Sequence, residues 1–445
     1  MHKSFKIITL GCKVNQYETA YLKERLLNAG WREAGNGECA DTAIVNTCIV
    51  TQRASHQTRQ AVRKAIRENP NATVAAIGCY AQSFPEELSR IPGVALIADN
   101  TRKGQLPELL WEAERSREKI VLSAPFETGM PFEALPIGRF PDRARAYLKI
   151  QDGCESFCSY CIVPTSRGPY RSLSPEKVLP MIESLAKAGH KEIVLTGIHL
   201  GKYGVDLKKE TTLYRLLRRI GRENFPLRFR LSSLEPDEIS RDLIDLVASE
   251  PWLCRHFHIP LQSGDNGVLK RMNRKYTTLA FVRLVEHIHR LIPLASIGID
   301  IMAGFPGETP AAHQDTVSLI RDLPVSYLHV FPFSPRPGTP ACTFDGKLDT
   351  NVIKKRAATM RELGQDKKIE FYHSCLGREF LVLPEKWHSK EKQIMKGTSD
   401  NYLPVLFTRS SDSEGELVSI LAERVEKGMV IGSLRDSCHD PKTRD

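Results

Sequence analysis

Short apolar runs alternate with amphipathic stretches along the first quarter of the chain. Each apolar run is long enough for one buried strand, and each amphipathic stretch repeats its apolar positions with the period of a helix. The predicted strands are Lys6–Leu10, Ala43–Val45, Thr73–Ile77 and Val94–Ile97, and the predicted helices are Gln16–Asn28, Gln52–Arg67 and Gln105–Ala113. Strands that alternate with helices predict a parallel α/β sheet, so we expect residues 1–114 to form an N-terminal α/β domain.

The same alternation restarts after residues 115–143, a charged segment with prolines and glycines that is typical of a linker. The predicted strands are Tyr147–Ile150, Glu192–Leu195, Arg228–Leu231, Phe257–Ile259, Ile297–Ile301 and Tyr327–Val330, and helices include Pro175–Lys187, Asp237–Ala248, Thr278–Leu291 and Ala311–Leu323. Six βα units predict a (β/α)6 partial barrel over residues 144–372, ending in a basic helical arm, Asn351–Tyr372. Its functional site is expected at the carboxyl ends of the strands.

Beyond Gly377 the pattern changes to five short strand-like runs separated by turn residues. They are Glu379–Leu383, Gln393–Met395, Leu403–Phe407, Leu417–Val425 and Met429–Ile431. This series predicts a small β-barrel over residues 373–437, followed by a disordered tail at 438–445. Small β modules often bind RNA, but they also serve as docking surfaces.

Three cysteines follow the first strand of the predicted barrel with the spacing CxxxCxxC: Cys154, Cys158 and Cys161, hereafter the cysteine loop. Soft thiolates at this density suit zinc or an iron–sulfur cluster. A structural zinc site takes four protein ligands, whereas three cysteines can hold three corners of a cubane and leave the fourth iron open. An open iron can bind a substrate or a cofactor. Half of a zinc knuckle and three core cysteines remain as alternative interpretations.

Another set of cysteines follows three predicted strands of the N-terminal domain: Cys12, Cys48 and Cys79, hereafter the strand-end cysteines. Ligands of an open parallel sheet gather at the carboxyl ends of its strands, so these three thiols are expected to converge. Cys39 precedes a strand instead and is excluded from the set. The alternative is that the three are buried as small apolar residues, which is common for cysteine.

Small and polar residues follow the other strands of the predicted barrel. Among them are Gly197, Ser232, Glu235, Gln262 and Gly304. They would let a ligand backbone or ribose approach the strand ends closely. A single glycine after a strand is usually only a turn residue. Small or polar residues at equivalent positions after several strands are stronger evidence for a binding site. His258, on the fourth strand, is either a ligand or a core histidine, and we favour the core or a position just behind the ligands.

The distribution of charge points to a class of partner. The formal net charge is +10, and residues 115–374 carry +9, so the excess surrounds the cysteine loop. A positive field of this kind fits a polyanion. Four arginines are candidates for contacts with RNA: Arg167 and Arg171 beyond the loop, and Arg59 and Arg63 on one face of a predicted helix. A solvated surface is the alternative for these arginines.

The cysteine content argues for metal or redox chemistry rather than a disulfide framework. There are 11 cysteines, an odd number, and the first residues lack the apolar region of a secretion signal. No apolar run is long enough to span a bilayer. We therefore expect a cytoplasmic protein that makes no contact with a membrane.

Together these residues resemble the radical S-adenosylmethionine (SAM) methylthiotransferases over essentially the whole chain. The cysteine loop, with the following Ile162-Val163-Pro164 and Arg167-Gly168, is similar to the family's radical SAM cluster loop. The strand-end cysteines resemble its N-terminal cluster domain, and the last module resembles its TRAM domain, a small RNA-binding barrel. The segment Leu10–Glu18 resembles the MtaB group, which modifies N6-threonylcarbamoyladenosine in tRNA. One departure is the net charge of −1 over residues 375–445.

The resemblance implies SAM and two 4Fe-4S clusters as cofactors. The cysteine loop would hold the cluster that cleaves SAM, and the five small and polar residues named above are candidates to line SAM. The strand-end cysteines would hold the cluster whose open iron carries the transferred sulfur. The product would be tRNA methylthiolated at C2 of N6-threonylcarbamoyladenosine next to the anticodon. The partners implied are tRNA, an external electron donor and a sulfur source, and we expect a monomer.

Three alternatives remain for the activity. Two keep the chemistry and change the substrate, to isopentenyladenosine in tRNA or to an aspartate of a ribosomal protein. The third belongs to another class, a metal-stabilised RNA-binding protein without catalysis.

Overall fold

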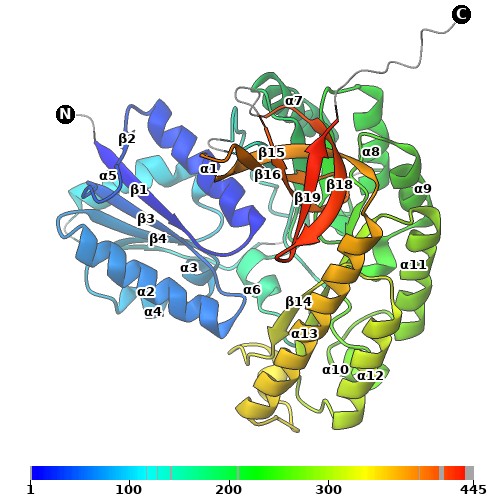
Figure 1. Cartoon of the computed structure of the whole chain (residues 1–445). Coiled ribbons are helices and arrows are strands. Elements are labelled where there is room, and N and C mark those ends of the chain that lie inside the picture. The colour runs from blue at the N-terminus through cyan, green and yellow to red at the C-terminus, as the bar shows by residue number, and fades with distance from the viewer. Residues whose placement is uncertain are drawn as a thin grey trace, which may run out of the picture.

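The computed structural model describes residues 3–116, 118–127, 129–140, 143–207, 210–389, 391–409 and 415–435. Figure 1 shows an α/β domain at the N-terminus, a larger curved domain in the middle and a small sheet-rich domain near the C-terminus. No helix in the described part of the chain combines the length and the apolar composition that a membrane crossing requires.

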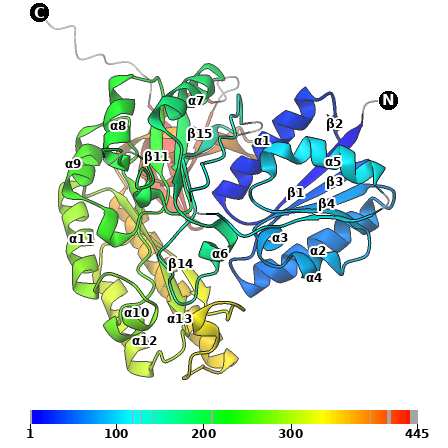
Figure 2. The ribbon, with the colours of Figure 1, turned by 180° about the vertical axis from the view of Figure 1, so that it is seen from behind.

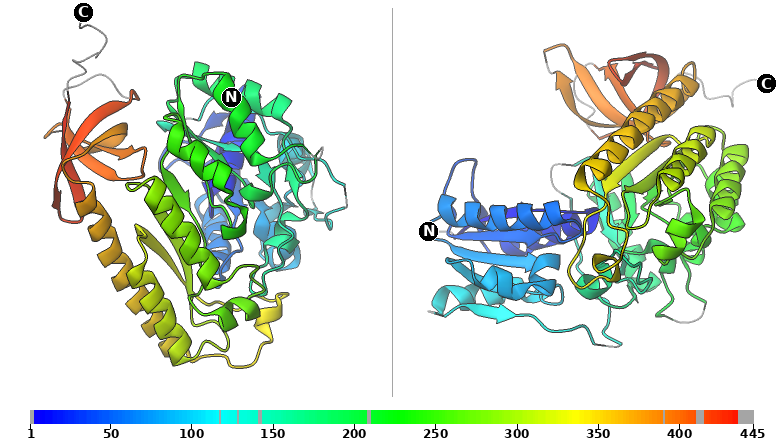
Figure 3. Two further views of the ribbon diagram at one scale, coloured as in Figure 1. Left: turned by 90° about the vertical axis from the view of Figure 1, so that its right-hand side faces the viewer. Right: turned by 90° about the horizontal axis from the view of Figure 1, so that it is seen from below.

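The N-terminal domain is built on a six-stranded sheet with the order β2-β1-β3-β4-β5-β6, in which all neighbours are parallel. The strands are β1 Ser4–Thr9, β2 Arg32–Glu33, β3 Thr42–Thr47, β4 Thr73–Gly78, β5 Val94–Ala98 and β6 Ile120–Leu122. The helices are α1 Lys13–Asn28, α2 Gln52–Glu68, α3 Cys79–Ser83, α4 Pro85–Ser89 and α5 Leu106–Arg115. They cover both faces of the sheet (Figure 3), so every residue of the central strand β3 is buried. The predicted parallel α/β domain is confirmed.

One boundary differs from the sequence interpretation. Strand β6 lies inside residues 115–143, which the composition predicts to be a linker, and it pairs with β5 as the edge of the N-terminal sheet. The run Ile120–Leu122 is short and stands among charged residues, so its pairing is visible only once the sheet has formed. The N-terminal domain therefore extends beyond residue 114.

The middle domain holds six parallel strands in two sheets, β7-β10-β11 and β12-β13-β14, joined by a parallel bridge from Phe229 to Leu253. The strands are β7 Arg145–Lys149, β10 Glu192–Thr196, β11 Arg228–Leu231, β12 His256–His258, β13 Ser296–Ala303 and β14 Tyr327–Pro332. The helices are α7 Pro175–Lys187, α8 Leu213–Arg222, α9 Arg241–Ser249, α10 Asn266–Arg271, α11 Thr278–Leu291 and α12 Pro310–Asp322. They lie outside the curved sheet (Figure 2), which confirms the predicted partial barrel.

Local sequence explains where several of these helices begin. The side chains of Ser240, Thr277 and Thr309 accept hydrogen bonds from the backbone N–H groups of the first turns of α9, α11 and α12. Such caps satisfy amides that have no partner within the helix. The short elements β8 Gln151–Asp152, α6 Val163–Arg167 and β9 Arg171–Ser172 flank the cysteine loop.

The arm and the last domain follow as predicted. Helix α13, Thr350–Ser374, leads into a closed barrel of five strands with the order β15-β16-β17-β19-β18 (Figure 3). The strands are β15 Glu379–Ser389, β16 Ile394–Ser399, β17 Pro404–Thr408, β18 Val418–Glu426 and β19 Met429–Leu434. The predicted tail at 438–445 lies outside the described residues.

Two buried arginines of β11 attach this small barrel to the middle domain. Arg228 donates to the carbonyl oxygens of Leu381 and Thr398 at 2.6 and 2.9 Å. Arg230 donates to those of Asp400 and Ser399 at 2.8 and 2.9 Å. Both guanidinium groups also contact the buried carboxylate of Glu192, at 2.7 and 2.8 Å. These contacts satisfy backbone carbonyls that would otherwise be buried without partners.

Candidate functional site

The cysteine loop lies at the carboxyl end of the first barrel strand, between β8 and α6. Gly153, directly before the loop, has φ +79°, and a Cβ atom there would lie 1.7 Å from the carbonyl oxygen of Pro169. The turn that starts the loop therefore requires glycine. The amide of Cys154 donates to Gly168 O at 2.9 Å, and the amide of Cys161 donates to Cys158 O at 2.9 Å. These bonds hold three thiols on one short segment.

Positive groups approach two of these thiols. The Sγ atom of Cys154 lies 3.3 Å from Nδ1 of His199, whose Nε2 lies 2.6 Å from the Glu238 carboxylate. Burial opposes protonation of His199, but the bonds to Cys154 and Glu238 raise its pKa to about 10. Arg274 donates to the Sγ atom of Cys158 at 3.3 Å. Both cations favour the thiolate form, which is the form that binds metal.

The strand-end cysteines follow β1, β3 and β4, which are adjacent in the sheet. A Cβ atom on Gly11 would lie 2.8 Å from the Sγ atom of Cys48, so the loop that carries Cys12 lies directly against Cys48. Burial, and next the charge of Cys79, raise the pKa of Cys48 to about 12. The structure therefore brings the three residues together, as the parallel topology predicts.

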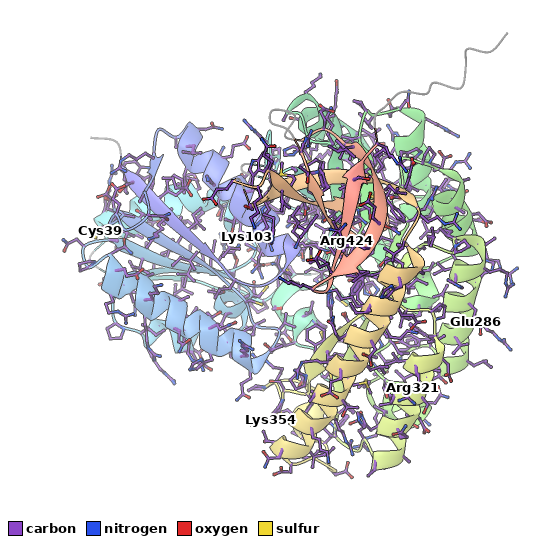
Figure 4. All side chains as sticks on the ribbon, viewed as in Figure 1. Cys39, Lys103, Glu286, Arg321, Lys354 and Arg424 are labelled. Carbon is purple, nitrogen blue, oxygen red and sulfur yellow. The ribbon has the colours of Figure 1, made fainter. Side chains whose placement is uncertain are left out.

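Cys39 lies apart from this set. It is exposed, and its thiol donates to the carbonyl oxygen of Glu68 at 3.3 Å, at the end of α2. Figure 4 shows Cys39 at the outer edge of the N-terminal domain, whereas Lys103 lies toward the middle domain.

A buried charge network links Cys79 and α1 of the N-terminal domain to the segments that flank the cysteine loop. Arg167 on α6 donates to Glu18 Oε1 at 2.6 Å, to Asn15 Oδ1 at 2.6 Å and to the Sγ atom of Cys79 at 3.1 Å. The carboxylate of Glu18 also accepts from Lys103 and from Lys149, the latter at 3.2 Å. Despite burial, these three cations hold the pKa of Glu18 well below its usual range. Sequence reasoning did not single out Glu18, because nothing local shows that α1 faces α6.

Two predicted RNA contacts need correction. Arg167 is only 1% exposed and is committed to Glu18 and Cys79. Arg171 is 6% exposed and donates to the carbonyl oxygen of Arg167 at 2.9 Å. Arg167 is held by Asn15, Glu18 and Cys79 of the N-terminal domain, and the guanidinium of Arg171 lies over the ring of Phe126. Their positive charges stabilise the buried carboxylates of Glu18 and Asp152 instead.

The other two arginines lie on α2. Arg63 is exposed. Arg59 is partly buried and donates to the hydroxyl oxygen of Tyr80 at 2.6 Å and to the carboxylate of Glu87 at 3.3 Å. An RNA contact by either residue stays a prediction, and Arg63 is the more accessible of the two.

Three of the predicted SAM residues present polar groups at the strand ends. The hydroxyl oxygen of Ser232 is buried and has no hydrogen-bond partner among the described residues. Glu235 forms an ion pair with Arg274, and burial raises its pKa. Gln262 adopts a left-handed φ of +65° and lies on the wall of a cavity. An unsatisfied buried hydroxyl fits a site that accepts a polar ligand.

Packing accounts for the two predicted glycines. A Cβ atom on Gly197 would lie 2.7 Å from Oε1 of Gln151, and one on Gly304 would lie 2.5 Å from Cγ1 of Ile353. The amide of Gly304 already donates to Glu308 at 2.8 Å. Contact of either glycine with SAM stays a prediction.

A cavity of about 180 Å³, hereafter the interdomain cavity, is lined by residues of both domains. Its lining residues are Val50, Thr51, Tyr160, Cys161, Ile162, Val163, Gln262, Asp300, Met302, Phe331, Pro332 and Ser334. Val50 and Thr51 follow Cys48 closely in the chain, and Cys161 belongs to the cysteine loop. Hydrogen bonds from Gln52 N to Ser334 Oγ (3.1 Å) and from Arg336 to Ser55 Oγ (2.7 Å) join the domains beside it. The cavity therefore lies where the N-terminal and middle domains meet.

The fold and the cysteine loop define a class of protein. A model of the radical SAM superfamily matches residues 148–320, and a model of the uncharacterized protein family UPF0004 matches residues 4–99. The chain is thus a radical SAM enzyme, and its class implies a 4Fe-4S cluster and SAM.

Full-length relatives show the family. The chain is 37% identical to the threonylcarbamoyladenosine tRNA methylthiotransferase MtaB of Bacillus subtilis (strain 168), over 93% of this chain and 92% of the relative. It is 38% identical to the protein of that name from Aquifex aeolicus (strain VF5), over 93% and 98%. It is 32% identical to the tRNA-2-methylthio-N(6)-dimethylallyladenosine synthase of Pelotomaculum thermopropionicum, over 99% and 100%. The chain belongs to the radical SAM methylthiotransferase family.

Solved structures support the fold. The radical SAM methyltransferase TsrM from Kitasatospora setae, with cobalamin and a [4Fe-4S] cluster bound, matches with a TM-score of 0.56 at 17% identity, over 77% of each chain. The cobalamin-dependent radical SAM enzyme OxsB matches with a TM-score of 0.50 at 13% identity, over 80% of this chain and 56% of that one.

Proposed function

We propose that this enzyme transfers a methylthio group to C2 of N6-threonylcarbamoyladenosine next to the anticodon of tRNA. The observation that carries the proposal is that residues beside both sets of cysteines, Val50 and Thr51 after Cys48 and Cys161 of the cysteine loop, line one interdomain cavity. Support for the nucleoside comes from relatives named for threonylcarbamoyladenosine at 37% and 38% identity, and from the residues around Cys12. A tRNA substrate also fits a cytoplasmic protein.

Each set of cysteines fits one 4Fe-4S cluster in the proposal. The three thiolates of the cysteine loop would hold the cluster that works with SAM, and the strand-end cysteines would hold the cluster that supplies the transferred sulfur. When bound, these groups supply radical and sulfur chemistry that side chains cannot perform on an aromatic C–H bond.

The chain's own residues hold and isolate this chemistry. His199 and Arg274 stabilise the thiolates of the cysteine loop, and Arg167 donates to Cys79. Ser232 and Glu235 would orient SAM at the strand ends. Apolar walls of the interdomain cavity, including Met302 and Phe331, would keep water from the reacting atoms.

The last barrel is proposed to bind tRNA as a TRAM domain. Its segment, residues 375–445, has a net charge of −1, so its RNA contacts must come from a local basic face. The remaining phosphate contacts would come from the middle domain and from exposed arginines such as Arg63. An external electron donor and a sulfur source complete the set of partners, and the active species is proposed to be a monomer.

Mass spectrometry of nucleosides tests the substrate. In tRNA digests from cells that lack this protein, 2-methylthio-N6-threonylcarbamoyladenosine should disappear while its unmethylthiolated precursor accumulates. Loss of the methylthio-isopentenyl nucleoside instead would favour the activity named for the relative at 32% identity. Unchanged tRNA with a ribosomal protein of altered mass would assign the aspartate.

Iron content and SAM cleavage test the class. Anaerobically purified protein should hold about eight irons per chain, two cubanes of four, and should cleave SAM when reduced. Protein that holds only zinc and never cleaves SAM would be the non-catalytic RNA-binding alternative.

A further inference from the structure

The sheet β12-β13-β14 has an apolar face, which packs in the hydrophobic core, and an opposite face that carries polar side chains. Ile297, Ile299 and Ile301 of β13 are fully buried in the main hydrophobic cluster. Asp300 alternates with them and therefore points to the opposite face, where it lines the interdomain cavity. The parallel register places His329 beside Asp300, and His258 beside Gly298 on the same face.

These side chains form a compact group, hereafter the His–Asp–His cluster: His258, Asp300 and His329. Oδ1 of Asp300 lies 3.1 Å from Nε2 of His258 and 3.3 Å from Nδ1 of His329. Its single carboxylate therefore orients both rings. The side chain of His329 is 55% exposed, and its Nε2 atom has no hydrogen-bond partner among the described residues. That nitrogen is free to meet a ligand.

Lys13 reaches the same region from the N-terminal domain. It follows Cys12 directly and is the first residue of α1. Helix α1 packs against β7 of the middle domain, and charged neighbours of Lys13 include Arg145 on β7, Arg230 on β11 and Asp300 on β13. Among the described residues its amine has no hydrogen-bond or ion-pair partner. A half-buried lysine with no partner of its own leaves a place for an anion.

Positive charge exceeds negative charge around Lys13. Glu192 is shared by three guanidinium groups, those of Arg145, Arg228 and Arg230, at 2.9, 2.7 and 2.8 Å. Arg145 also pairs with Glu385 at 2.7 Å. The carboxylate of Asp300 is engaged by the two histidines. Apart from Asp300, this group therefore contains four cations, Lys13 and the three arginines, and two carboxylates, Glu192 and Glu385. The first turn of α1 adds no acidic residue.

We propose that Lys13 and His329 bind the carboxylate of the N6-threonylcarbamoyl group, and so select this nucleoside over one with an apolar substituent. This inference rests on the proposed function. The threonyl carboxylate is the charge that an isopentenyl group lacks. Its binding would supply Lys13 with the partner it lacks in the protein alone. Placement next to Cys12 would hold the modified base between the two sets of cysteines. Lys13 and His329 are specificity-determining residues in this scheme.

Binding without turnover is the primary test. The full chain, anaerobically reconstituted and left unreduced, is titrated with three anticodon stem-loop RNAs. These carry N6-threonylcarbamoyladenosine, its methyl ester or N6-isopentenyladenosine. The wild type should bind the acid about tenfold or more tightly than the ester, because one ion pair is removed. Equal affinities would overturn the inference.

Variants identify the cation. Lys13→Met should remove the preference for the acid over the ester, Lys13→Arg should restore part of it, and His329→Phe should weaken it severalfold. Lys23→Met is the matched control, because Lys23 lies on the same helix and pairs with Glu33 at 2.6 Å. An acid preference that survives in Lys13→Met would overturn the role of Lys13. If Lys13→Met loses iron, the inference is judged from the affinities of the wild type for the acid and ester RNAs.

Turnover separates this inference from the proposed function. Single-turnover methylthiolation by the wild type should give product with the acid RNA. No product with that RNA would refute the proposed substrate itself. Product formed equally well from the acid and the ester would leave the proposed function standing and refute only the carboxylate contact. A divalent metal bound stoichiometrically and lost in His329→Phe would assign the His–Asp–His cluster to that metal and also overturn the inference.

Discussion

The cysteine loop and the strand-end cysteines present three thiols each, but the chain assembles them differently. Cys154, Cys158 and Cys161 stand within eight positions of one loop, whose start is fixed by Gly153. Cys12, Cys48 and Cys79 come from three strands and meet only because β1, β3 and β4 are neighbours in a parallel sheet. The first set depends on local backbone geometry, and the second depends on a complete domain.

The two sets also differ in their charged surroundings. His199 and Arg274 of the middle domain approach the cysteine loop. The strand-end cysteines receive their nearest guanidinium, that of Arg167, from the other domain. The strand-end cysteines therefore gain their cationic neighbour only when the two domains have docked, whereas the cysteine loop has its cationic neighbours within its own domain.

Removal of one ligand from the cysteine loop should have the largest effect. Cys158→Ala is expected to abolish both reductive SAM cleavage and methylthio product, by more than about a thousandfold, because no other group supplies the radical. Deoxyadenosine and product are measured by mass spectrometry after reduction. Persisting SAM cleavage would show that the cysteine loop is not the site of that reaction.

Removal of one strand-end ligand should separate the two activities. Cys79→Ala is expected to keep reductive cleavage of SAM yet give no methylthio product, and iron should fall from about eight to about four per chain. The same assay, with iron analysis, checks the result. Loss of both activities would instead assign Cys79 a structural role, or show that the two sites fold together.

The charge network between the sets should matter for stability. Glu18→Gln leaves Arg167 and Lys149 with Asp152 as their remaining carboxylate and leaves the buried Lys103 with only Asn100 Oδ1, at an expected cost of about 3–5 kcal/mol in the free energy of unfolding. Urea denaturation of anaerobically prepared protein measures it. The exposed Glu68→Gln, on α2, is the matched control and should change stability by less than about 0.5 kcal/mol. Equal stability of both variants would contradict the network's role.

The smallest expected effect concerns SAM at the cysteine loop. Ser232→Ala removes a buried hydroxyl that has no partner in the protein, so it should not destabilise the fold, but it should weaken SAM binding about five- to tenfold. Equilibrium binding of SAM and the thermal midpoint are compared with the wild type. Unchanged SAM affinity would remove Ser232 from the site.

Sequence reasoning succeeded where a signal is local or repeats with a fixed period. The strand Arg228–Leu231 and the helices Pro175–Lys187 and Thr278–Leu291 have the predicted bounds. Convergence of the strand-end cysteines followed from one topological rule rather than from their spacing. The five strands of the last barrel were visible because turn residues separate them.

Prediction from the sequence failed where the burial of a residue depends on packing between segments far apart in the chain. Arg167 and Arg171 look like surface arginines in the sequence, but Arg167 is buried against Glu18 of α1 and Arg171 against Asp152 and Phe126. Strand β6 was not predicted because three residues are too few to show a strand pattern, and only its pairing with β5 identifies it. Sequence reasoning placed His258 on a strand but could not unite it with Asp300 and His329, because that requires the register of three strands.

The contact between Glu18 and Arg167 has a consequence for biosynthesis. Its two partners are 149 residues apart, and a ribosome adds about 5–20 residues per second, so Glu18 is made roughly 7–30 s before Arg167. During that interval Lys103, which is synthesised earlier than Arg167, is the cation that can neutralise Glu18 inside the nascent domain. Cys79 therefore lacks its guanidinium partner until translation has passed the cysteine loop.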